Sequence, residues 1–205
     1  MGLAGTYLTF EGLKAAANAS DDFVRLNMSI KQVVSTEREF DVAQQAIRET
    51  AKTLGEPIKT VAALYIELQK GVTKLGGTQA EAIQLTETLS KAFRLSGESA
   101  SDARSQTDLF AKMLLTGTIN TVQFNAIMDK SPALAKALAS GLGVTTFALK
   151  DMATNGELSV SKLTHALLSQ KDAIDKGYAE TPLLIGAAFE RVTNRIKLTV
   201  VTTQL

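Results

Sequence analysis

Apolar residues recur along this chain at steps of three and four, the spacing that places side chains on one face of an α-helix. The clearest run starts at Ile58 and continues to Leu75. Gly76-Gly77 follows directly, and glycine readily takes the left-handed conformation that ends a helix. The pattern therefore predicts a helix over 58–75 with one face turned toward a core. The apolar face consists of Ile58, Val61, Tyr65, Leu68, Val72 and Leu75.

Polar residues at helix starts divide the rest of the chain into further helices. Three pairs have the spacing of a capping box, in which two side chains bind backbone N–H groups at the first turn. Elsewhere a serine or threonine precedes an apolar run, and glycine follows it. The three pairs are Thr36–Glu39, Thr78–Glu81 and Asn120–Gln123. The expected helices cover 35–54, 58–75, 78–96, 99–116, 120–128, 131–140, 145–152, 159–168 and 181–196.

The segment around Ser131-Pro132 gives the strongest helix start. Serine is expected to cap the helix, and proline at the first helical position loses no hydrogen bond that the helix needs. Leu134 and Leu138 form part of the expected buried face, and Gly141 and Gly143 are expected to close the helix.

Two stretches allow more than one interpretation. Residues 23–33 alternate in a way that suits a strand, but their apolar positions also fit a helix, which is the interpretation favoured here. The tail KLTVVTTQL could be a strand, a frayed helix or an artificial end to a longer chain.

Short connections between successive helices predict that neighbours fold back on one another. The fold class expected is all-α, a compact multi-helix bundle or array of short antiparallel helices. The chain has 205 residues, of which 45% are hydrophobic, so it can bury a sizeable core. We expect one domain over residues 1–205.

The overall charge and the residues that are missing narrow the classes of partner. Lysine and arginine number 22 against 21 acidic residues, so no excess of positive charge favours nucleic acid. Cysteine is absent, which excludes disulfides and thiolate metal sites. No apolar run approaches the roughly 20 residues that span a bilayer, so no transmembrane segment is expected.

Candidate chemistry is sparse. His165 is the only histidine, whereas metal sites and nucleophile–base pairs usually need more such groups. Gly141-Leu-Gly143 follows an alanine-rich helix and lacks the strand and lysine of a phosphate-binding loop. We therefore expect no catalytic residue, no metal and no cofactor, and a structural or binding role instead of an enzyme.

Three stretches together resemble the N-terminal domain of phage tail tape measure proteins. They are LGGTQAEAIQLTETLSKAFRLSGESASDARS (75–105), GTINTVQFNAIMDKSPALAKALASGLGV (117–144) and ALKDMATNGELSVSKLTHALLSQ (148–170). The resemblance covers about residues 20–195 and rests on the order and spacing of caps and small residues.

The resemblance implies a virion protein of phages or prophages that sets tail length while the tail tube polymerises around it. It would occupy the tube lumen in a few copies, after assembly in the host cytoplasm. The implied partners are the tail tube protein, tail assembly chaperones and tail tip proteins. A ruler must be long, whereas the many caps predict a compact domain with a radius of gyration of roughly 17 Å. The chain is therefore expected to be either a fragment of a longer protein, which is the interpretation favoured here, or a truncated prophage remnant. Its globular part is expected to be a docking or anchoring module.

The surface expected to dock lies in the second stretch, where small residues would let another helix approach closely. Ordinary packing within the domain is the competing interpretation of the same residues. Two other functions remain open: a helical adaptor or regulatory domain unrelated to phages, and a peptidoglycan-lytic accessory domain. The candidate interaction residues are Phe124, Asn125, Pro132, Ala133, Ala135, Ala137 and Ala139.

Overall fold

The computed structural model describes residues 23–181. Residues 23–31 form a helix, as favoured from the sequence. The predicted final helix beyond Thr181 and the KLTVVTTQL tail lie outside the described residues. The helices that follow are α2 (Glu37–Leu54), α3 (Ile58–Lys74), α4 (Gln79–Leu95), α5 (Ala100–Thr116), α6 (Thr121–Lys130), α7 (Pro132–Leu142), α8 (Thr146–Thr154), α9 (Val160–Ser169) and α10 (Lys171–Glu180).

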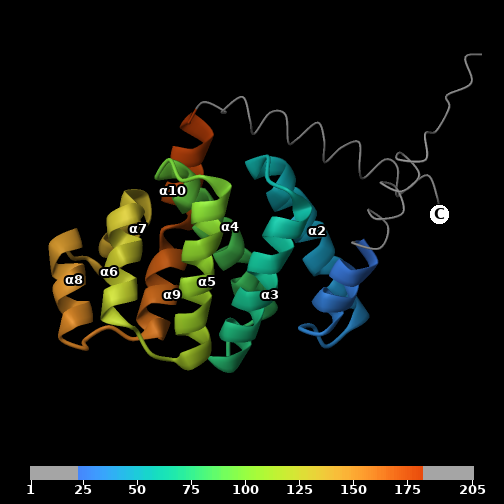
Figure 1. Ribbon diagram of the computed structural model, residues 1–205, viewed down its shortest axis with the longest axis horizontal. Helices are drawn as coiled ribbons and strands as arrows, with labels where there is room; N and C mark the ends of the chain where they lie inside the picture. Colours follow the sequence, from blue (N-terminus) through green and yellow to red (C-terminus); the bar gives the residue numbers. More distant parts are fainter. Residues whose placement is uncertain (1–22, 182–205) are drawn as a thin grey trace, which may run out of the picture.

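The fold is an all-α array, as the sequence predicts, and the described range contains no strand. In Figure 1 the helices run from α8 at one edge, through α6, α7, α9, α5 and α4, to α3 and α2 toward the other edge. Helix α4 lies centrally and packs against α2, α3, α5, α7, α9 and α10. The core is therefore continuous along the array.

Local capping explains where most helices begin. Thr36–Glu39 and Thr78–Glu81 form complete capping boxes, which confirms the prediction for both pairs. Asn120 accepts a hydrogen bond from the backbone N–H of Gln123 at 3.0 Å, but no reciprocal bond completes the expected box. One cap bond therefore suffices at α6.

Two glycines at the end of α7 have different roles. Gly143 ends the helix in the left-handed conformation, with φ of 69°, as predicted. Gly141 lies inside α7, so the prediction that it closes the helix is wrong. A Cβ at this position would lie 2.2 Å from the carbonyl oxygen of Ala166, so Gly141 permits the close approach of α7 to α9.

Helix α10 was not predicted from the sequence. Its only buried residue is Ile174, and Gly177 lowers its intrinsic helix propensity. The helix lies against α4, where Gly177 faces Leu95. Tyr178 also donates a hydrogen bond to the carbonyl of Thr53 at 3.1 Å. Tertiary contacts, not local pattern, account for this element.

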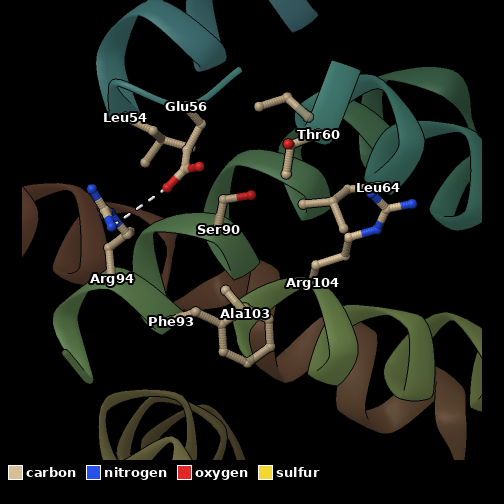
Figure 2. A pocket seen from close by; sticks show the side chains of 10 residues that line it. Leu54, Glu56, Thr60, Leu64, Ser90, Phe93, Arg94, Ala103 and Arg104 are labelled. Carbon is tan, nitrogen blue, oxygen red and sulfur yellow. Dashed lines mark ion pairs between the residues drawn. The ribbon is translucent and has the colours of Figure 1, made fainter. Parts of the chain in front are cut away.

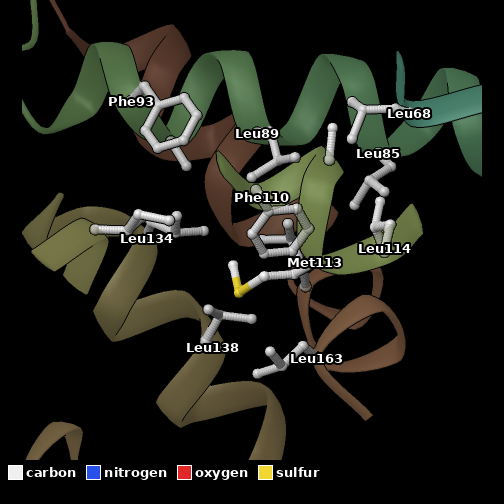
Figure 3. Close-up of a cluster of buried hydrophobic side chains, with 14 of the residues drawn as sticks. Leu68, Leu85, Leu89, Phe93, Phe110, Met113, Leu114, Leu134, Leu138 and Leu163 are labelled. Atoms are coloured by element: carbon white, nitrogen blue, oxygen red, sulfur yellow. The ribbon is translucent and has the colours of Figure 1, made fainter. Parts of the chain in front are cut away.

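The centre of the core joins five helices (Figure 3). Each large aliphatic or aromatic side chain removed from water contributes roughly 1.5–3 kcal/mol to stability before the entropic cost of ordering. The buried side chains of this cluster are Leu68 of α3, Leu85, Leu89 and Phe93 of α4, Phe110, Met113 and Leu114 of α5, Leu134 and Leu138 of α7, and Leu163 of α9.

Candidate functional site

The turn between α4 and α5 meets the break between α6 and α7. Ser96, the first residue of this turn, accepts a hydrogen bond through Oγ from the backbone N–H of Ala133 at 3.1 Å. That N–H belongs to the first turn of α7, which has no intrahelical partner for it. Ser96, which follows α4 and is 37 residues away in sequence, therefore caps α7.

Ser131 occupies the N-cap position of α7, but the expectation that its side chain caps the helix is wrong. Its side chain makes no cap bond to the helix and is fully buried. Its hydroxyl instead contacts Gln106 Oε1 at 2.6 Å and also Glu98 Oε1. Pro132 at the first helical position is as predicted. The side chain of Ser131 thus joins the α6–α7 break to Glu98, 33 residues earlier, and to Gln106, 25 residues earlier.

A third contact closes this polar cluster, because Nε2 of Gln106 donates to Oε2 of Glu98. Gln106 is buried, and Glu98 is half-buried. We name Ser96, Glu98, Gln106, Ser131 and Ala133 the cap junction. It joins the first two stretches that carry the family resemblance.

The pKa of the Glu98 carboxyl is raised at the cap junction. Burial is the largest cause, and the nearby Asp102 carboxylate acts in the same direction. Hydrogen bonds from Ser131 and Gln106 and the positive charge of Lys130 oppose the shift. Because the effect of burial is the largest, the Glu98 carboxyl keeps its proton to a higher pH than an ordinary glutamate.

Most of the candidate interaction residues lie inside the domain. Phe124, Ala135, Ala137 and Ala139 are all buried in the core. Their small size or apolar character serves packing between this chain's own helices.

The three other candidates lie nearer the surface. Pro132 is exposed, whereas Asn125 and Ala133 are half-buried. The side-chain oxygen of Asn125 is buried and has no hydrogen-bond partner among the residues of the 23–181 range.

A charged cluster fixes α10 to α4. Lys91 is 8% exposed and pairs with Glu87 at 2.5 Å and with Asp175 at 2.6 Å. Asp175 also pairs with Lys171. Burial by itself lowers the pKa of Lys91, but the hydrogen bonds to Asp175 and Glu87 outweigh it and the pKa is raised. The pKa of Asp175 is lowered, because its bonds from Lys171 and Lys91 outweigh the opposing effect of burial.

A small pocket lies between the α2–α3 connection, α4 and α5 (Figure 2). Its volume of about 20 Å³ is enough for roughly one water molecule. Glu56 and Arg94 form an ion pair across it, with 3.4 Å between Oε1 and Nη1. Thr60, Ser90 and Arg104 also line it. Its size does not suit an organic substrate.

A larger, open groove lies over α3, between the end of the first described helix and α5. Its lining mixes apolar side chains with charges of both signs, so it has no single chemical character. The lining includes Val33, Ile66, Lys70, Arg104, Asp108 and Leu115.

The described range brings together no group of three or more metal-binding side chains. His165 is exposed on α9. Within the same range, no single helix has the length and apolar character to cross a membrane, and only α7 and α8 taken together, bent by 81°, pass that test of composition.

These features define an all-α domain whose polar clusters connect its own helices. The chain belongs to the tape measure protein family, whose match extends over residues 14–204. This confirms the resemblance found in the sequence and identifies the chain as a component of a phage tail. Comparison with curated proteins and with solved structures finds no match.

Sequence reasoning missed the cap junction. Glu98 stands between Gly97 and Ser99, where a solvated loop carboxylate is the ordinary interpretation. Gln106 gives no signal beyond a polar position in a helix. The one available hint was that the Leu-Ser-Gly turn and the Ser-Pro start both belong to the family pattern, but nothing in the sequence shows that they touch.

Proposed function

We propose that this chain is the globular docking module of a tape measure protein that sets tail length and sits in the lumen of the tail tube. The observation that carries the proposal is the family match over residues 14–204 on a fold made of short helices. The longest of the helices α2–α10 has 18 residues, which spans about 27 Å. A segment folded in this way is suited to anchoring, and the measuring part is assigned to another region of a longer protein.

The docking surface proposed is the exposed margin of the α6–α7 break. Pro132 is accessible there, and the half-buried Asn125 and Ala133 lie near it in sequence. The side-chain oxygen of Asn125, which has no hydrogen-bond partner within residues 23–181, is available to accept a hydrogen bond once the surface adjusts on binding. Tail tube, chaperone and tip proteins are the partners proposed, with several copies of the chain in each tail.

A non-enzymatic role agrees with these features. The family is structural. A helical adaptor outside phage tails and a lytic accessory domain are less well supported, because the family match favours a tail protein.

Tail length measured by electron microscopy tests the anchoring role. In the phage or prophage that encodes this chain, deletion of residues 121–154 removes α6–α8. A ruler segment of that size would shorten every tail by roughly 50 Å at about 1.5 Å per helical residue. An anchor instead predicts fewer tails, and those that form keep the parental length.

A substitution separates loss of the anchor from loss of chain length. Phe124→Ala should disrupt folding without changing the number of residues. We therefore expect fewer tails than in the parent, and the tails that do form should have the parental length. Ser140→Ala, at an exposed position of α7, is the matched control and should leave tail number unchanged. Uniform shortening in the deletion strain would contradict the anchoring role.

A further inference from the structure

Three side chains of the cap junction form a ring of three hydrogen-bond contacts, but Ser131 and Gln106 together supply protons for only two of them. Three side chains meet pairwise: Ser131 with Glu98, Ser131 with Gln106, and Gln106 with Glu98. Each contact needs one proton between its two heavy atoms. Ser131 supplies one from its hydroxyl, and the Gln106 amide supplies one to the ring.

A protonated Glu98 carboxyl supplies the third proton. The carboxyl then donates to Ser131, Ser131 donates to Gln106, and Gln106 donates back to the other carboxyl oxygen. With an ionised carboxylate, one contact brings two oxygen lone pairs together without a proton. The count is the same for either orientation of the Gln106 amide, because a reversed amide also directs only one N–H into the ring.

The ring lies where separate parts of the array meet. Glu98 belongs to the α4–α5 turn, Gln106 to α5, and Ser131 to the α6–α7 break. Ser96 of the same turn also caps α7 through Ala133. Opening the ring therefore loosens the attachment of α7 to α4 and α5.

We propose that Glu98 is a proton-controlled latch, which closes the cap junction when the carboxyl is protonated and loosens it when the proton is lost. The latch is a property of this fold and does not depend on the docking partner proposed above. It would let a change of pH alter how firmly the α6–α8 edge is held to the rest of the domain.

The charges around Glu98 act in both directions. Asp102, on α5, favours the protonated form. Hydrogen bonds donated by Ser131 and Gln106 favour the ionised form, although the contact between Ser131 and Gln106 then lacks a proton. Lys130, at the end of α6, also favours the ionised form, and so does the partial positive charge at the N-terminus of α7. Burial favours the protonated form most strongly, and the pKa of Glu98 is raised.

The sign of the pH effect follows from this direction. The folded chain binds the Glu98 proton more tightly than the unfolded chain, whose glutamate has a pKa of about 4.3. The stabilisation is therefore complete below about pH 4.3 and is lost as pH rises through the raised pKa. Each unit by which the folded pKa exceeds the unfolded value changes the opening equilibrium by up to about tenfold.

Two measurements on the 205-residue chain test the latch. Carbon-13 NMR of the Glu98 side-chain carboxyl should give a titration midpoint above about 4.3, the pKa of a glutamate in the unfolded chain. Hydrogen exchange should show that protection of the Ala133 amide, corrected for the intrinsic pH dependence of exchange, falls as pH rises from about 4.5 to 8.

Glu98→Gln provides the decisive variant, because its amide N–H supplies the third proton of the ring at every pH and keeps the ring closed. Protection of Ala133 in this variant should be independent of pH and, at pH 8, higher than in the parent chain. Glu157→Gln is the matched control and should keep the parental pH dependence. A Glu98 titration midpoint at or below about 4.3 overturns the proposal. So does a Glu98→Gln variant in which protection of the Ala133 amide falls between about pH 4.5 and 8 as much as it does in the parent chain. The NMR titration uses the unsubstituted chain, so it decides the matter even where a variant does not fold.

Discussion

Single residues in this domain are often constrained by a neighbour that is distant in sequence. Gly141 lies against the backbone of Ala166, and Gly71 lies against Leu114, whose Cβ would be 2.4 Å from a Cβ added to the glycine. At both positions the absence of a side chain sets how closely two helices approach. Neither φ lies in the left-handed region, so packing and not backbone conformation requires glycine there.

Gly141→Ala should destabilise the chain by about 1–3 kcal/mol, the usual cost of overpacking. The added methyl meets a backbone carbonyl that cannot rotate away, and this outweighs the gain of up to about 1 kcal/mol in helix propensity. Urea denaturation measures the change. Ser140→Ala, next to it but exposed, should change stability by less than about 0.5 kcal/mol. A stabilised Gly141→Ala variant would show that α7 and α9 are farther apart than the structure gives.

At the scale of elements, helix α10 depends on its ion pairs with α4. Lys91 is buried and shares Asp175 with Lys171, so one carboxylate serves two ammonium groups. Tyr178 also lies near Lys91, with 6.0 Å between the ammonium nitrogen and the ring centroid. These contacts stabilise α10, which buries only Ile174 and so gains little from apolar packing.

Asp175→Asn should lower the free energy of unfolding by about 1–2 kcal/mol at pH 7, because Lys91 keeps only Glu87 as a carboxylate partner within the charged cluster. The folded pKa of Asp175 is lowered, so its contribution is present above the unfolded pKa of about 3.9 and is lost as pH falls through the folded value. Denaturation curves at pH 7 and at low pH check both points.

The control for this prediction is Asp151→Asn, which changes an exposed carboxylate on α8. It should cost less than about 0.5 kcal/mol at pH 7. Equal losses from the two substitutions would show that the charged cluster contributes nothing specific to the attachment of α10.

At the scale of the whole molecule, α4 connects the two sides of the array. It contacts α2, α3 and α5 and also α7, α9 and α10. Its buried positions are accordingly not confined to one narrow stripe and include Thr86, Thr88 and Ser90 as well as leucines. The domain should therefore unfold as one unit, not helix by helix.

Leu89→Ala should cost about 2–5 kcal/mol, because a fully buried leucine is replaced by a cavity. Hydrogen exchange should show loss of protection in α3 and α9 together. Phe147→Ala, at a position that is 74% exposed, should change stability by less than about 0.5 kcal/mol. If Leu89→Ala reduced protection from hydrogen exchange in α3 but not in α9, the domain would instead consist of two independent folding units.

The sequence by itself determined the all-α class, the starts of most helices and the family. Capping boxes such as Thr78–Glu81 act over three residues, and the apolar stripe of α3 repeats within one helix, so both can be recognised without knowing the fold. The same local reasoning failed where a side chain has a distant partner. Tertiary structure alone decided that Ser131 binds Glu98 and Gln106 while Ser96 caps α7. It also decided the place of Gly141 and the existence of α10, because these depend on which helices meet and not on the order of residues within any one of them.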